Sequence, residues 1–167
     1  ALVELVNENS LVEAWMDGRL RGQNTQKNPG TWTDIPASYA QDLTDKYNTW
    51  LKGRFPAAAL SEWRKEAGVA ADAPLPRLRP DQFAKAGRER FHAEATFYME
   101  VERDHFLDMQ RYLREEIGLK PLLAGNSDHG HGRTGYPQLA GTSLLDVVDS
   151  HVYWQHPNYQ TDPQTGR

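Results

Sequence analysis

Short apolar runs near the two ends of the chain enclose a long region of helical periodicity. Residues 2–7 are largely apolar and β-branched, and residues 120–125 and 147–153 show a similar pattern. Runs of this length predict three buried strands. Because strands that are separated by helices pair in parallel through right-handed crossovers, we expect an α/β fold.

The region after the first strand begins with a helix start signal. Ser10, followed by Glu13 three residues later, has the spacing of a capping box and predicts one or two helical turns up to Gly18. Residues 19–36 are polar and rich in turn-forming residues, which indicates a long loop.

Two helices and a rigid connector are predicted next. Apolar residues recur at helical spacing over residues 36–54, and a second helix is predicted over residues 56–67, where Gly68 ends it. The segment 70–80 is rich in proline, which is typical of a rigid connector.

The strongest periodicity lies in residues 81–117, where apolar side chains repeat every three or four residues and predict a long amphipathic helix ended by Gly118. The repeating positions are Phe91, Ala95, Tyr98, Val101, His105, Met109, Leu113 and Ile117. Four charged residues between them are interpreted as the solvated face of this helix: Glu100, Glu102, Arg103 and Asp104.

Polar and aromatic side chains follow each predicted strand. Parallel α/β folds place ligand sites at the carboxyl ends of their strands. A carboxyl at the tip of a buried strand is costly unless it is paired, hydrogen-bonded or used, which makes Glu8 the leading candidate. The groups are Asn7 and Glu8 after the first strand, Asn126, Asp128 and His129 after the second, and His151, Tyr153 and Trp154 at the third.

These strand ends resemble those of the clan A glycoside hydrolases, the retaining (β/α)8 barrels that include cellulase-like enzymes. The resemblance covers the first ten residues and roughly residues 98–157. It depends on the pair Asn7-Glu8, on the run His151-Val152-Tyr153, and on the helix-to-strand passages Arg111-Tyr112-Leu113-Arg114 and Gly118-Leu119-Lys120-Pro121-Leu122.

The resemblance implies a partial (β/α)8 (TIM) barrel, an internal fragment that holds strands four to six. Residues 1–167 would form one domain, with residues 19–80 as a helical insertion. By resemblance, Glu8 is the general acid/base and Tyr153 orients the nucleophile. That nucleophile, a glutamate at the seventh strand, is missing, so the isolated chain should have no normal turnover.

Further substrate contacts are expected from four residues near Glu8. Asn7 would hydrogen-bond a sugar hydroxyl and Trp154 would offer a flat face to a sugar ring, and Asn126 and His151 complete the expected carbohydrate site. No cofactor and no metal are expected.

Charge and hydropathy argue against two classes of binding partner, nucleic acids and membranes. With 19 basic and 23 acidic side chains the net charge is -4, which gives no electrostatic footprint for nucleic acid. No apolar stretch reaches the ~20 residues that cross a bilayer, so no membrane partner is expected. Cysteine is absent, which excludes disulfides and thiolate chemistry. The compartment stays open, with a secreted or periplasmic protein favoured, and a homo-oligomer is expected to cover open strand edges.

Other hypotheses stay open beside the hydrolase. Glu8 could cap the helix that follows it, Asn126 could form an Asx turn, and His151 could be a core histidine. The chain could be a non-catalytic carbohydrate-binding or interaction module. It could also be a metal-dependent hydrolase that uses His129 and His131, because alternating histidines can bind zinc.

Overall fold

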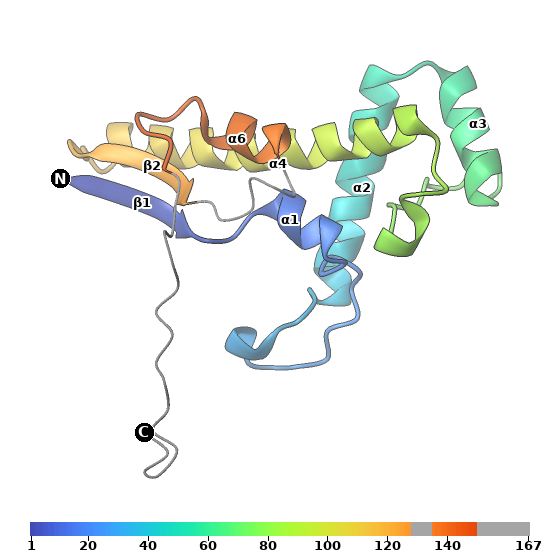
Figure 1. Ribbon diagram of the computed structural model, residues 1–167, viewed down its shortest axis with the longest axis horizontal. Coiled ribbons are helices and arrows are strands. Elements are labelled where there is room, and N and C mark those ends of the chain that lie inside the picture. Colours follow the sequence, from blue (N-terminus) through green and yellow to red (C-terminus); the bar gives the residue numbers. More distant parts are fainter. Residues whose placement is uncertain (128–134, 150–167) are drawn as a thin grey trace, which may run out of the picture.

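Helix α4 is the longest element, and the other elements are arranged along it (Figure 1). The computed structural model describes residues 1–127 and 135–149. In chain order its elements are β1 (Leu2–Asn7), α1 (Leu11–Met16), the 3-10 turn η1 (Pro29–Thr31), α2 (Ala37–Arg54), α3 (Ala57–Ala67), the 3-10 turn η2 (Pro80–Gln82), α4 (Arg88–Glu115), β2 (Leu122–Ser127) and α6 (Tyr136–Thr142).

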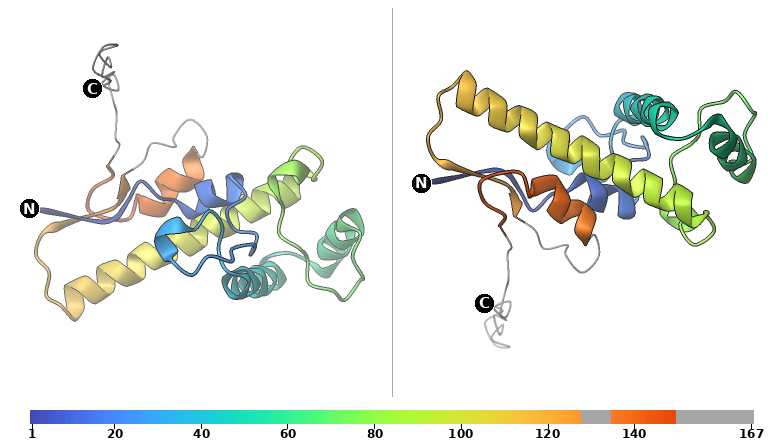
Figure 2. Two further views of the ribbon diagram at one scale, coloured as in Figure 1. Left: turned by 90° about the horizontal axis from the view of Figure 1, so that it is seen from below. Right: turned by 90° about the horizontal axis from the view of Figure 1, so that it is seen from above.

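Strands β1 and β2 form one small parallel sheet beside the C-terminal half of α4. Their register pairs Leu2 with Leu122 and Asn7 with Ser127, so both strands end at the same edge. Val147 joins β2 on its other side through a single parallel bridge to Ala124. Figure 2 shows α6 on one side of α4 and α2 on the other.

The prediction of a partial barrel was wrong, although the two strands do pair in parallel. Helices make up 54% of the structure, and the described residues contain only two strands, far from the strand content of a barrel. The third predicted strand contributes one bridge at Val147 before the described residues end at 149. The strand-helix-strand order predicted the direction of pairing, but a barrel needs many strands with matched tilt and stagger to close on itself.

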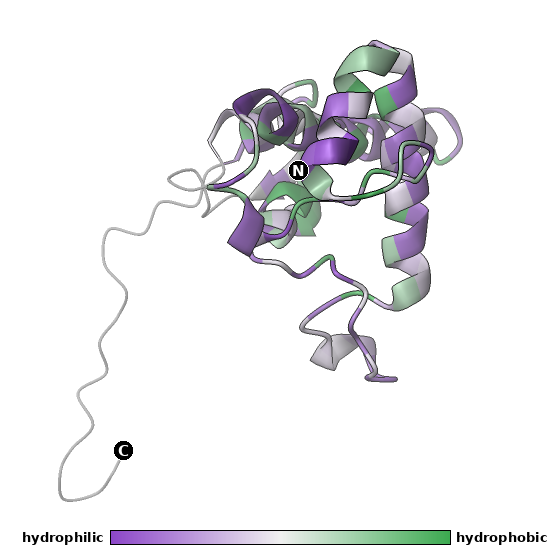
Figure 3. Ribbon diagram, turned by 90° about the vertical axis from the view of Figure 1, so that its right-hand side faces the viewer, coloured by the Kyte–Doolittle hydropathy of each residue, from purple (hydrophilic) through white to green (hydrophobic). Residues whose placement is uncertain are grey.

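The helices form where the periodicity predicts them. Helices α2 and α3 follow Pro36 and Pro56, whose rings fix a backbone suited to a helix start. Gly68 ends α3 in the left-handed conformation, at a φ of 69°, and this costs a glycine little. Polar and apolar residues alternate along the helices (Figure 3), as expected of elements that bury one face.

The main core lies where α1, α2 and α3 meet the first half of α4. Trp15 of α1 is its centre: the ring lies 4.8 Å from that of Phe83 and 5.1 Å from that of Tyr98. The indole N–H of Trp15 donates to the carbonyl of Leu78 at 3.0 Å, so the ring is buried without losing its hydrogen bond. This contact ties the proline-rich connector to α1.

A stripe of buried residues along α4 includes three charged side chains, and we call it the α4 stripe. Its members are spaced by four residues and at most 6% exposed: Arg90, Glu94, Tyr98, Glu102 and Phe106. The interpretation of Glu100 and Glu102 as solvated was therefore wrong. Glu102 is buried, and Glu100 accepts hydrogen bonds from Trp50 and Arg54 at 2.7 Å. Arg103 and Asp104 do pair with each other at the surface.

Glu94 joins α4 to the connector. Both of its carboxyl oxygens lie 2.9 Å from the backbone nitrogen of Leu78. The hydroxyl of Tyr98 donates to Oε1 of Glu94 at 3.4 Å. The same hydroxyl accepts a hydrogen bond from Arg77 at 2.9 Å. Burial raises the pKa of Glu94 to about 8, although the Leu78 N–H, Arg77 and Arg90 act in the opposite direction. Glu94 is therefore largely protonated in the folded protein at neutral pH.

The far end of α4 is tied to β2 and to the segment after α6. Arg114 donates to the carbonyls of Leu119 and Pro121 and pairs with Asp146. Asp146 also accepts the N–H of Leu123 at 2.8 Å. At Gly125 a Cβ atom would lie 2.8 Å from the Thr142 side chain, so only glycine lets α6 pack this closely on β2.

We expect Glu94→Gln to remove part of the pH dependence of stability. The folded pKa near 8 exceeds the ordinary 4.5, so the contribution of Glu94 is fully present below pH 4.5 and is lost as the pH rises towards 8. Urea unfolding between pH 4.5 and 8 should show a steeper loss for the parent than for Glu94→Gln. Glu62→Gln, at an exposed ion pair with Lys65, is the control and should keep the parental slope. Identical slopes for the parent and Glu94→Gln would contradict this account.

Candidate functional site

The end of β1 holds a non-glycine residue in the left-handed region. Glu8 has a φ of 49°, the one positive φ outside glycine among residues 1–127 and 135–149. A side chain there costs roughly 1–2 kcal/mol because Cβ approaches the carbonyl oxygen. Such strain gathers at functional sites, where the surrounding structure holds it in place. Asn7 and Glu8 are both exposed at this edge of the sheet.

Asn126 lies beside this turn, at the end of β2. It pairs in register with Val6 and is 1% exposed. Its side-chain oxygen accepts the N–H of Asn9 at 3.1 Å, which fixes the backbone directly after Glu8. Its Nδ2 is buried with no hydrogen-bond partner among the described residues. Buried polar atoms are rarely left unpaired, so this amide marks the strand edge as a candidate site.

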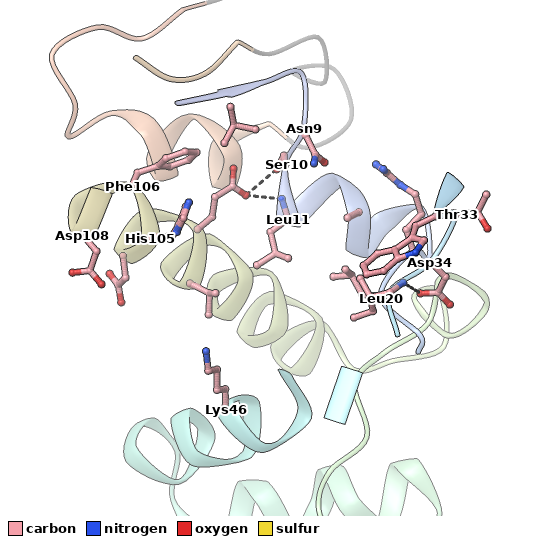
Figure 4. A pocket seen from close by; sticks show the side chains of 18 residues that line it. Asn9, Ser10, Leu11, Leu20, Thr33, Asp34, Lys46, His105, Phe106 and Asp108 are labelled. Atoms are coloured by element: carbon pink, nitrogen blue, oxygen red, sulfur yellow. Dashed lines mark hydrogen bonds between the residues drawn. The ribbon is translucent and has the colours of Figure 1, made fainter. Parts of the chain in front are cut away.

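Glu102 fixes the segment from the other side. Its Oε2 accepts the hydroxyl of Ser10 at 3.0 Å and the N–H of Leu11 at 2.8 Å (Figure 4). The Ser10 hydroxyl in turn caps α1 by accepting the N–H groups of Val12 and Glu13. A carboxylate at a helix N-terminus is stabilised by the free N–H groups and by the helix dipole. We call the two hydrogen bonds that Glu102 accepts, from the Ser10 hydroxyl and the Leu11 N–H, the Glu102 clasp.

A cleft of about 810 Å³ opens beside the Glu102 clasp (Figure 4). It extends from the end of β1, between α1 and α4, to the loop before α2 and to Lys46 on α2. The residues that line it are Val6, Asn9, Ser10, Leu11, Ala14, Arg19, Leu20, Trp32, Thr33, Asp34, Ile35, Lys46, Val101, Glu102, Asp104, His105, Phe106 and Asp108.

Asp34 shapes the loop wall of this cleft. Its carboxylate accepts backbone N–H groups of Arg21, Gly22, Gln23 and Ile35 at 2.8 to 3.3 Å and is 7% exposed. Four N–H donors occupy the two oxygens of this carboxylate and leave little room for a ligand. Asp34 therefore holds the loop rather than serving as a free acid.

The predicted site residues are only partly placed. Asn7, Glu8 and Asn126 come together at one edge of the sheet, as expected. His151, Tyr153 and Trp154 lie outside the described residues, and so do Asp128, His129 and His131 of the metal hypothesis. Among residues 1–127 and 135–149, no three His, Cys, Asp or Glu side chains are grouped as metal ligands would be.

Helix capping of α1 does not depend on Glu8, because Ser10 and Glu102 supply it. Reasoning from the sequence missed Glu102 and the cleft. The signal for Glu102 was present: it lies four residues after Tyr98 and four before Phe106, both buried, so helical periodicity places it on their face. Nothing in the sequence pairs Asp34 with the loop that it organises.

The sequence matches no protein-family model, no curated protein and no solved structure. Within the described residues, no helix is both long and apolar enough to span a membrane. Support for the candidate site therefore comes from its own geometry.

We expect Ser10→Ala to destabilise the protein by about 1–2 kcal/mol, since it removes a helix cap and leaves a bond of Glu102 unmade. Chemical unfolding measures the change. Ser38→Ala, at an exposed position in the first turn of α2, is the matched control and should stay within about 0.5 kcal/mol of the parent. Equal effects of the two substitutions would argue against the Glu102 clasp.

We expect Glu8→Gly to stabilise the fold by about 1 kcal/mol, because glycine adopts the left-handed backbone without strain. Glu8→Ala keeps the Cβ atom and should gain nothing. Thermal unfolding of the two variants separates backbone strain from loss of the carboxylate. A Glu8→Gly protein that is no more stable than Glu8→Ala would show that the backbone at this position is relaxed.

Proposed function

We propose that this chain carries the acid/base half of a retaining glycoside hydrolase site, with Glu8 as the general acid/base. The observation that supports it best is the strained backbone of Glu8 at the carboxyl end of two parallel strands. Asn126 and Glu102 fix the residues directly after it. Such a site needs a carboxyl held firmly at a ligand-binding edge, and this position provides one.

The proposed reaction uses two carboxyls about 5–5.5 Å apart. Glu8 donates its proton to the leaving oxygen and later removes one from water. The second carboxylate attacks the sugar carbon, and no described residue is assigned to that role. Asn7 would hydrogen-bond a sugar hydroxyl, and His151, Tyr153 and Trp154 would complete the substrate contacts in this proposal.

Glu8 is favoured over Glu102 and Asp34, the two buried carboxylates of the neighbouring cleft, by its position at the exposed strand edge. Oε2 of Glu102 accepts two hydrogen bonds at the start of α1, and Asp34 accepts four backbone N–H groups. Both are buried and serve the fold. An acid/base residue must instead reach substrate, and Glu8 is exposed at the strand edge.

A non-catalytic carbohydrate-binding module is the second candidate function. It is favoured by the number of carboxyls at the strand edge. The described part of the site offers one exposed carboxyl there, and retaining hydrolysis needs two. Binding of an oligosaccharide without release of reducing sugar, in the protein in which this chain occurs naturally, would support this alternative.

Glu8→Gln tests the acid/base role in that natural protein. For an alkyl glycoside, kcat/KM should fall by roughly 10²–10⁴, because the leaving oxygen no longer receives a proton. A dinitrophenyl glycoside should lose far less in its first step, since its leaving group departs without protonation. Azide should restore turnover by attacking the glycosyl-enzyme without help from a base.

Glu4→Gln, at an exposed glutamate on the same strand, is the matched control and should keep parental activity. An equal loss on both substrates, or full activity of Glu8→Gln, would contradict the proposed role.

A further inference from the structure

The floor of the cleft is apolar. Leu11 of α1, Ile35 of the loop and Val101 of α4 line it, and each is only partly buried in the protein core. Leu20 and Phe106, which are both buried, also line the cleft. These side chains come from three separate segments and converge on one hollow (Figure 4). Covering such a floor with apolar ligand surface is favourable by roughly 25 cal/mol per Å².

Two buried carboxylates of the cleft are committed to the protein, whereas Nε of Arg19, which is also in the lining, is buried with no hydrogen-bond partner among the described residues. Asp34 binds the loop backbone, and Oε2 of Glu102 binds Ser10 and Leu11. The apolar floor offers no hydrogen bonds to the hydroxyls of a sugar ring, although Lys46, Asp104 and His105 also line the cleft. An aromatic ring or alkyl chain needs none, and Trp32 at the loop wall supplies a further flat apolar surface.

The position of the cleft relative to Glu8 fixes which part of a substrate it receives. Val6 and Asn9, which flank the pair Asn7-Glu8, both line the cleft. A residue that protonates the leaving oxygen lies next to the leaving group. The volume of about 810 Å³ is within the usual range for small-molecule sites and is ample for an aryl or short alkyl group.

We infer that this cleft is the aglycone subsite, and that the substrate is a glycoside with an aryl or alkyl leaving group rather than an unbranched polysaccharide. The inference rests on the proposed role of Glu8 for its link to hydrolysis. The apolar subsite itself is tested by binding alone.

The experiment compares phenyl and methyl glycosides of the same sugar, over a panel of common pyranoses in both anomeric forms, by calorimetric titration of this chain. The phenyl glycoside of at least one sugar should bind about tenfold more tightly than its methyl partner, because its ring covers the apolar floor. Val101→Phe fills the floor and should abolish that gain. Val69→Phe makes the same change at a partly buried valine outside the cleft and should keep it.

Val101→Thr is the second variant, nearly the same shape as the parent, and is used if Val101→Phe does not fold. It should reduce the phenyl gain about threefold, since it places a hydroxyl on the floor. Val69→Thr should have no effect.

Two outcomes overturn the inference: no phenyl glycoside binds more tightly than its methyl partner, or the gain survives both substitutions at Val101. Failure of the proposed function gives a different result. In that case the phenyl gain depends on Val101, but Glu8→Gln does not distinguish good from poor leaving groups.

Discussion

The carboxylate of Glu102 is the interaction on which the candidate site depends. It projects from the middle of α4 and receives the hydroxyl of Ser10 and the N–H of Leu11. Leu11 begins α1 and Ser10 caps it, two residues after Glu8, so the segment that follows β1 is anchored to the longest helix of the fold. Asn126 holds Asn9 from the sheet side. Glu8 therefore lies between the paired strand β1 and this anchored segment, in a strained backbone, and Asn9 directly after it lines the cleft.

Hydrogen bonds from buried side chains of α4 to the backbone of a neighbouring segment recur along the α4 stripe. Arg90 donates to the carbonyl of Pro76, Glu94 accepts the N–H of Leu78, and Glu102 accepts the N–H of Leu11. Each of these buried ionisable side chains therefore meets a backbone group of the proline-rich connector or of the first residue of α1. Ionisable groups are costly to bury unless they are hydrogen-bonded, and each of these three is bonded to a backbone group. Helix α4 thus positions both the connector and the start of α1 with side chains that apolar residues could not replace.

Local patterns predicted the elements well. The apolar run at residues 2–7 predicted β1, and the spacing of Ser10 and Glu13 predicted α1. Helices α2 and α3, which follow prolines, each begin one residue after the predicted start. The long helix begins at Arg88, after the predicted 81, because η2 and the turn after it occupy residues 80–87. Hydrophobic period and turn residues are local signals, so they fix such elements without knowledge of the fold.

The tertiary features, namely the number of strands, the burial of Glu102 and the cleft, could not be predicted from local sequence patterns. The barrel was inferred from polar strand ends, yet strand ends converge in any parallel pair and carry no information about strand number. Glu102 was assigned to solvent because its charge was weighed above its position between Tyr98 and Phe106. The cleft brings together a loop, three helices and a strand whose residues are up to about a hundred positions apart, and no spacing in the sequence predicts that these segments meet. The meeting of Asn7, Glu8 and Asn126 at one sheet edge could be predicted, because Asn7 ends β1, Glu8 follows it and Asn126 is the second-last residue of β2.

Hydrogen exchange at the backbone N–H of Leu11 tests the central claim most directly. The first N–H groups of a helix have no partner within the helix and normally exchange rapidly. If the Glu102 carboxylate receives this N–H, the Leu11 amide should be protected in the parent protein and should exchange much faster in Glu102→Ala, with the amides of α3 unchanged. An unprotected Leu11 amide in the parent would show that α4 does not hold the start of α1, and the anchored Glu8 would lose its physical basis.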